Sequence, residues 1–123
     1  MKMKLKNSEA LERLHSLKPL LSHRNKVGYV AARNYRFLSN SITEFDTIRL
    51  SLIEKYGERG NDERGVPTYT LSVDSPKFKE FCDELAPFNE MEHEVELMTA
   101  KYDDAIGTLS GEEILSIDWM LED

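Results

Sequence analysis

An apolar stripe with the repeat of an α-helix runs through the first half of this 123-residue chain and constrains the fold most strongly. From Leu38 onward, large apolar side chains recur on one helical face, at Ile42, Phe45, Ile48, Leu52 and Tyr56. An unbroken helix over residues 25–56 would be about 45–50 Å long, which is long for so small a chain. Residues 39–41 are a candidate kink, so the sequence allows one long helix or two shorter ones.

Helix signals also mark both ends of the chain. Asn7 or Ser8 can cap a short amphipathic helix that Pro19 ends. Near the C-terminus, Ser110 and Glu113 have the spacing of a capping box. Apolar residues then follow at helical spacing, namely Ile114, Ile117 and Leu121. We therefore predict an N-terminal and a C-terminal helix besides the central helical stretch.

Two segments in the second half of the chain have a strand pattern. Residues 67–73 alternate between apolar and polar side chains, as a half-buried strand does. Residues 93–99 also alternate, although the apolar spacing over residues 91–102 fits a helix equally well. Because one isolated strand would leave its backbone groups unpaired, we expect residues 93–99 to pair with residues 68–73.

A further helix is predicted between these two strands. Residues 74–76 provide an N-cap followed by a proline, and we expect the helix to stop before Pro87. Its apolar residues recur at helical spacing, at Phe78, Phe81, Cys82 and Leu85. Cys82 is therefore expected to be a buried small side chain. As the only cysteine, it excludes an intrachain disulfide and a multi-cysteine zinc site.

These elements together predict an α+β fold that is mostly helical. It contains N-terminal helices, including a long or kinked one, a two-stranded antiparallel sheet and a C-terminal helix. We expect residues 1–123 to form a single small domain, with a helical region at 1–57 and an α+β region at 66–123. The polar segment 57–65, with three glycines, is expected to be the mobile surface loop that joins them.

Charge is distributed unevenly along the chain. The formal net charge is −7, but residues 1–36 carry +7 and residues 37–123 carry −14. Residues 90–123 contain eleven acidic residues and a single base, Lys101. Such asymmetry can indicate a basic partner. Alternatively, the two oppositely charged ends face each other inside one fold or between subunits.

Two groups of charged residues are candidate partner-binding sites. The acidic group consists of alternating glutamates and an aspartate pair, namely Glu90, Glu92, Glu94, Glu96, Asp103 and Asp104. On a strand, the glutamates would project from one face, where they could contact a basic partner, mimic nucleic acid or prevent edge-to-edge aggregation. The basic and aromatic group lies in one run, at Arg24, Lys26, Tyr29, Arg33 and Arg36. It could contact an acidic protein or nucleic acid, or be an ordinary solvated face.

Motifs for catalysis are missing from the sequence. It contains no P-loop and no Gly-x-Ser-x-Gly elbow, and its three histidines do not have metal-site spacing. Adjacent carboxylates are expected by chance in a chain with 23 acidic residues. We therefore predict a protein without enzymatic activity, metal or cofactor. The acidic net charge argues against nucleic acid as its main ligand, and no apolar run approaches the roughly 20 residues of a membrane-spanning helix.

Several segments resemble a family of small tailed-bacteriophage proteins of unknown function. They include the opening residues 3–9, the helical segments 27–34 and 48–57 and the acidic glycine loop. The likeness continues through residues 94–97 and the closing residues 109–122. Trp119 and the acidic stretch 90–96 depart from the family pattern. The resemblance implies a phage origin and supplies no catalytic residues.

From these features we expect a phage accessory protein that binds a host protein. It would modulate or inhibit that protein, in defence evasion or host takeover, through an acidic surface around residues 90–96 and the C-terminal helix. It would then act in the host cytoplasm. The alternative is a structural or assembly component of the virion that packs through its long helix. The apolar stripe of residues 27–56 also allows a homo-oligomer.

Overall fold

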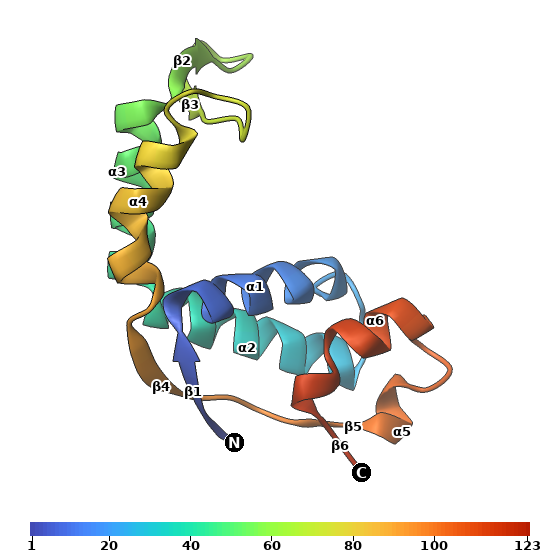
Figure 1. Cartoon of the computed structure of the whole chain (residues 1–123). Helices are drawn as coiled ribbons and strands as arrows, with labels where there is room; N and C mark the ends of the chain where they lie inside the picture. The colour runs from blue at the N-terminus through green and yellow to red at the C-terminus, as the bar shows by residue number, and fades with distance from the viewer. The chain divides into compact units, whose positions relative to one another are not determined.

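The structure, a computed structural model, describes residues 1–123 and confirms an α+β fold that is mostly helical. The chain forms two compact units, one from residues 1–42 and 92–123 and one from residues 43–91. The blue and red ends of the ribbon therefore belong to the same unit (Figure 1). These units have other boundaries than the predicted regions 1–57 and 66–123. None of the helices combines the length and apolar character that crossing a bilayer would require.

The first unit is built from both ends of the chain. Its N-terminal part consists of β1 (Lys2–Lys6), α1 (Asn7–Leu17), the 3-10 turn η1 (Lys18–Leu20) and α2 (Lys26–Ser41). Its C-terminal part consists of β4 (Glu92–Glu96), β5 (Ala100–Lys101), α5 (Tyr102–Ala105), α6 (Gly111–Ser116), the 3-10 turn η2 (Asp118–Met120) and β6 (Leu121–Glu122). Helix α1 packs against α2, and the core between the elements is apolar, with Leu17, Leu20, Val27, Leu38 and Ile117 fully buried.

Capping residues explain where two of these helices begin. The Asn25 side chain accepts a hydrogen bond from the Gly28 N–H at 2.8 Å and caps α2. At α6, the Glu113 N–H donates to Ser110 Oγ at 3.1 Å, and the Ser110 N–H donates to Glu113 Oε1 at 3.0 Å. The predicted capping box is therefore confirmed. Helix α6 nevertheless ends at Ser116, and the chain continues as η2 and β6.

The pairing of the strands differs from the prediction. The predicted strand over residues 93–99 is confirmed for residues 93–96, which lie in β4, but β4 pairs antiparallel with β1, from Lys2 opposite Glu96 to Lys6 opposite Glu92. The predicted pairing with residues 68–73 is wrong because those residues lie in the second unit. β5 and β6 form a short parallel pair. The strand β1, which was not predicted, is thus the pairing partner of β4 in place of residues 68–73.

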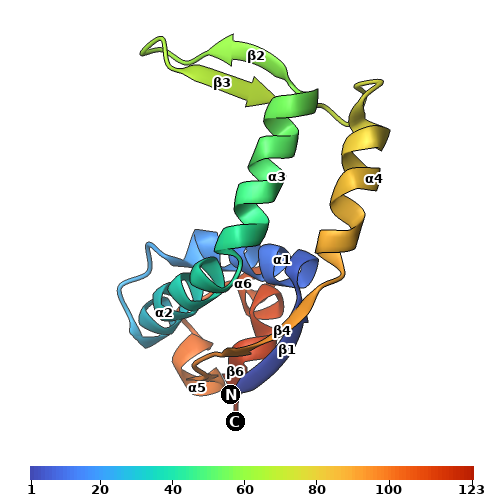
Figure 2. The same ribbon diagram turned by 90° about the vertical axis from the view of Figure 1, so that its left-hand side faces the viewer.

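The second unit is a pair of helices that carries a short hairpin of strands. It consists of α3 (Thr43–Tyr56), β2 (Glu58–Asn61), β3 (Pro67–Thr70) and α4 (Phe78–Asn89). α3 and α4 run alongside each other, and β2 pairs antiparallel with β3 (Figure 2). The prediction of a loop over residues 57–65 is therefore wrong for Glu58–Asn61. Phe45 and Leu85 are the only large apolar side chains that are buried in this unit.

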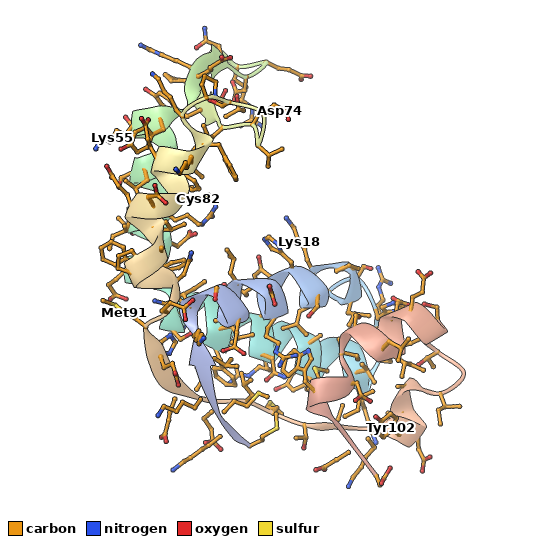
Figure 3. The ribbon with its side chains drawn as sticks, viewed as in Figure 1. Lys18, Lys55, Asp74, Cys82, Met91 and Tyr102 are labelled. Carbon is orange, nitrogen blue, oxygen red and sulfur yellow. The ribbon has the colours of Figure 1, made fainter.

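The structure decides between one and two helices for the central stretch. It also shows that two predictions are wrong, namely that the next helix stops before Pro87 and that Cys82 is buried. The central stretch forms two helices, since α2 ends at Ser41 and α3 begins at Thr43. Helix α4 continues through Pro87 to Asn89, because a proline in the last turn removes only one late backbone hydrogen bond. Cys82, labelled in Figure 3, is exposed rather than buried. Within its unit α4 packs against α3, so one neighbouring helix leaves part of its apolar stripe open.

Candidate binding site

The predicted glutamate ladder faces a ladder of lysines. Glu92, Glu94 and Glu96 are exposed on β4, and in register across the sheet stand Lys6, Lys4 and Lys2 of β1. Lys4 Nζ lies 3.9 Å from Glu92 Oε2, and the N-terminal ammonium lies 3.4 Å from Glu96 Oε1. Opposite charges directly across an antiparallel pair stabilise its register. The alternative that the two charged ends face each other inside one fold is therefore confirmed for this sheet.

The fourth glutamate of the predicted ladder lies elsewhere. Glu90 is the C-cap of α4 and belongs to the second unit, whereas β4 belongs to the first. The structure therefore does not continue the row of Glu92, Glu94 and Glu96 through Glu90 on one strand.

The acidic residues that follow β5 are not matched by bases in their own segment. Residues 102–123, here called the acidic C-terminal segment, contain seven acidic residues and no Lys or Arg. Asp103 of α5 and Glu112 of α6 are exposed and make no ion pair. Two large apolar side chains are also open to solvent here, with Ile106 63% and Leu115 78% exposed. This combination of acidic and apolar side chains is suited to a protein partner.

The basic and aromatic residues lie in or next to α2. Arg24 precedes the helix, Lys26 is its first residue, and both are exposed. Tyr29 is 61% exposed, and Arg36 is exposed as well. The Arg33 guanidinium lies 5.0 Å from the centre of the Phe37 ring and is held there by a cation–π contact. The run therefore forms the solvated side of α2.

One cavity joins residues from both predicted groups. The α2–β5 cavity has a volume of about 260 Å³ and is lined by Lys26, Tyr29 and Val30 of α2 together with Thr99, Ala100, Lys101, Asp104 and Glu122. It thus brings the basic Lys26 and the aromatic Tyr29 together with the acidic Asp104. Val30 and Ala100 are buried and give the cavity an apolar floor. Figure 1 shows β5, β6 and α5 beside the N-terminal end of α2, and both α5 and β5 contact this helix.

Sequence reasoning missed five of the cavity residues, namely Val30, Thr99, Ala100, Lys101 and Glu122. Only Lys101 had a visible signal, as the single base in the acidic stretch of residues 90–123. Val30 and Ala100 are ordinary core residues by local pattern, and they become part of a cavity only because α2 lies against β5.

The charges at the cavity are not equally available. Lys101 Nζ lies 3.2 Å from Glu122 Oε1, another lining residue, and 3.2 Å from the Asp123 carbonyl oxygen. Hydrogen bonds from Lys101 and then from the Thr99 hydroxyl lower the pKa of Glu122. Lys26 and Asp104 have no ion-pair partner. They are therefore the charged groups at this cavity that a ligand can contact without breaking an existing pair.

A buried asparagine holds the chain that leads into the cavity. Asn34 of α2 is completely buried, and its Nδ2 donates to the Met98 carbonyl oxygen at 2.9 Å. The Met98 N–H donates in return to Asn34 Oδ1 at 2.8 Å. The Asn34 amide thus satisfies both backbone hydrogen-bonding groups of Met98, just before β5 begins, as a neighbouring strand would.

The contact between His23 and α6 predicts a dependence of stability on acidic pH. His23 Nε2 lies 2.9 Å from Glu113 Oε2, and the Ser110 N–H followed by His23 lowers the pKa of Glu113 in the folded state. A carboxyl whose pKa is lower when folded stabilises the fold above its unfolded pKa. This contribution is lost as the pH falls through the folded pKa.

We therefore expect the melting temperature of the wild type to fall more steeply below about pH 4.5 than that of Glu113→Gln. Thermal denaturation between pH 7 and pH 3, followed by circular dichroism, measures the difference. Glu112→Gln is the matched control, because Glu112 is the exposed neighbour without an ion pair. If the melting temperatures of the wild type and Glu113→Gln fell equally steeply with pH, the attribution of this pH dependence to Glu113 would be wrong.

Two other cavities lie within single units. One, of about 310 Å³, is polar and lies in the second unit beside Glu58 and Asp74, and one of about 240 Å³ lies beside Arg13 and Ser116 in the first unit. No group of three or more His, Cys, Asp or Glu side chains is arranged to hold a metal ion. Comparison of the chain with known protein families, curated proteins and solved structures gives no match.

Proposed function

We propose that this chain is a non-enzymatic, phage-encoded accessory protein that binds and modulates a basic host protein. One observation carries the proposal, namely that the acidic C-terminal segment combines seven acidic residues, no base and the exposed side chains of Ile106 and Leu115. Carboxylates at the rim of an interface steer a basic partner, and apolar atoms contribute somewhat more than half of the area buried in an interface.

The proposed interface lies away from the glutamates of β4. Those carboxylates face lysines across the sheet, so a basic partner would have to compete with Lys2, Lys4 and Lys6. Asp103 and Glu112 face no such competition, because neither side chain makes an ion pair. We therefore retain Asp103 and Asp104 from the predicted acidic group as contact residues and assign Glu92, Glu94 and Glu96 to the stability of the sheet.

The alternative of a virion component rests on packing through one long helix. The division of that stretch into α2 and α3 leaves shorter apolar faces for such packing, and Leu38 of α2 is already buried in the first unit. Mass spectrometry of purified virions distinguishes the two functions, since a host-directed factor is expected in infected cells and not in the particle.

Charge reversal in the acidic C-terminal segment tests the proposed function. We expect Asp103→Lys combined with Glu112→Lys to weaken binding of the captured host protein about tenfold or more, because rim charges govern association with a charged partner. The measurement is affinity purification from host lysate, followed by titration of the identified partner with each variant.

The matched control places the same change of charge in the second unit. Glu80→Lys combined with Asp83→Lys alters two exposed acidic residues of α4 that make no ion pair, and we expect binding to be retained. If the control weakens binding as much as the test variant, net charge alone is responsible. If neither variant weakens binding, the acidic C-terminal segment is not the interface.

A further inference from the structure

We infer that the α2–β5 cavity receives one large apolar side chain of the partner protein, next to a basic residue that pairs with Asp104. The inference rests on the proposed function and deepens it, because it names the chemistry of the segment that is recognised. It concerns the cavity of about 260 Å³ lined by Tyr29, Val30 and Ala100.

The size of the cavity favours a single side chain. Sites for drug-sized ligands have volumes of roughly 300–1,000 Å³, and this cavity lies below that range at about 260 Å³. Its residues come from α2, β5, α5 and β6 and from Thr99 just before β5, and all of them belong to the first unit. Such a cavity suits one anchor residue of a partner, whose burial in a preformed pocket dominates the energy of many interfaces.

The surface of the cavity favours an apolar anchor. Val30 and Ala100 form its floor and are 7% and 6% exposed, whereas Tyr29 is 61% exposed. A tyrosine ring this open leaves an amphipathic surface in water, and an aromatic or aliphatic side chain placed against it would remove that surface from solvent. The exposure of Tyr29 next to a buried apolar floor therefore indicates a site for an apolar residue.

The charges at the cavity indicate the neighbour of the anchor. Asp104 is a carboxylate without an ion pair, and it belongs to the acidic C-terminal segment, which contains no base. An adjacent Lys or Arg in the partner would pair with Asp104, the one carboxylate at the cavity that no lysine already holds. The unpaired Lys26 at the same cavity disfavours basic residues on both sides of the anchor. We therefore expect one basic flank, not two.

Capped dipeptides provide a direct probe of this recognition. We expect acetyl-Phe-Arg-amide to shift the backbone amide signals of Tyr29, Ala100 and Lys101 in ¹⁵N-labelled protein. Acetyl-Phe-Glu-amide replaces the basic neighbour by an acidic one, and acetyl-Gly-Arg-amide removes the apolar anchor. Both are expected to bind more weakly than acetyl-Phe-Arg-amide. Asp104→Asn should weaken acetyl-Phe-Arg-amide about threefold, the effect of one exposed ion pair.

Glu12→Gln is the matched control for Asp104→Asn. It also removes one negative charge from the first unit, at an exposed residue of α1 that does not line the cavity. We expect it to leave binding of acetyl-Phe-Arg-amide unchanged, whereas Tyr29→Ala should weaken it by removing one wall. Because Tyr29 is mostly exposed, Tyr29→Ala is expected to fold, which unchanged signals from the rest of the first unit would verify.

Five results would each overturn the inference. They are no binding of acetyl-Phe-Arg-amide, shifts that lie outside the cavity, equal binding of acetyl-Phe-Glu-amide, equal binding of acetyl-Gly-Arg-amide, and equal weakening by Glu12→Gln and Asp104→Asn. The outcome can be separated from that of the proposed function. If Asp103→Lys with Glu112→Lys abolishes capture of the host protein while the dipeptide does not bind, only the cavity inference fails. If the dipeptide binds as expected while capture is insensitive to charge reversal, only the proposed interface fails.

Discussion

Asn34→Ala is expected to lower the free energy of unfolding of the first unit by about 2–4 kcal/mol. The substitution removes both hydrogen bonds between the Asn34 amide and the backbone of Met98, at 2.9 and 2.8 Å. The N–H and carbonyl of Met98 then lose their only protein partner in a partly buried position. A buried polar backbone group without a partner costs more than the hydrogen bond itself contributes. Urea denaturation followed by Trp119 fluorescence measures the change, because this single tryptophan lies in the first unit.

Two further variants make the Asn34 prediction specific. Tyr29→Ala on the same helix is expected to change the free energy of unfolding by less than about 1 kcal/mol, since Tyr29 is largely exposed. Asn34→Asp keeps an acceptor for the Met98 N–H but has no donor for its carbonyl oxygen, so it should also destabilise the unit. A loss below about 0.5 kcal/mol for Asn34→Ala would show that water replaces the amide.

Gly28→Ala is expected to destabilise the same unit by about 3 kcal/mol, at the upper end of the usual cost of overpacking. A Cβ atom at this position would lie 2.0 Å from the His23 carbonyl oxygen and 2.8 Å from its carbonyl carbon. Both atoms belong to the backbone, so the clash cannot be relieved by rotating a side chain. The turn at His23 would have to move. Asn25, which caps α2 by accepting a hydrogen bond from the Gly28 N–H, would have to move with it.

Gly111→Ala is the control for Gly28→Ala. A Cβ atom at Gly111 meets no atom within 4 Å, and the residue is the first of α6. Alanine there should be neutral or slightly stabilising, because it restricts the unfolded chain without a clash. Equal melting temperatures for Gly28→Ala and the wild type would mean that the chain around His23 adjusts without cost.

Local features of the fold could be predicted from the sequence because their causes lie within a few residues. The capping box of Ser110 and Glu113 is a contact over three positions, and the break between α2 and α3 lies beside the predicted kink at residues 39–41. The mostly helical α+β class follows from periodicity in the same way, whereas periodicity alone left residues 91–102 open between strand and helix.

Strand pairing could not be predicted in this way. Lys2 and Glu96 are far apart in the sequence, and β1 has only two inward-facing residues, Met3 and Leu5, to mark it as a strand. The clue that was available is the match between lysines at alternate positions of β1 and glutamates at alternate positions of β4. Charge alternation alone does not identify a partner, because it also fits a solvated face.

In the candidate site too, some features follow from the sequence and others only from the tertiary structure. The sequence by itself determined that bases lie near residues 24–36 and acids near residues 90–123, since charge is a property of composition. Only the tertiary structure decided which of them meet. It set Glu92, Glu94 and Glu96 against lysines and placed Lys26 and Tyr29 at one cavity with Asp104, because contacts between distant segments depend on packing and register.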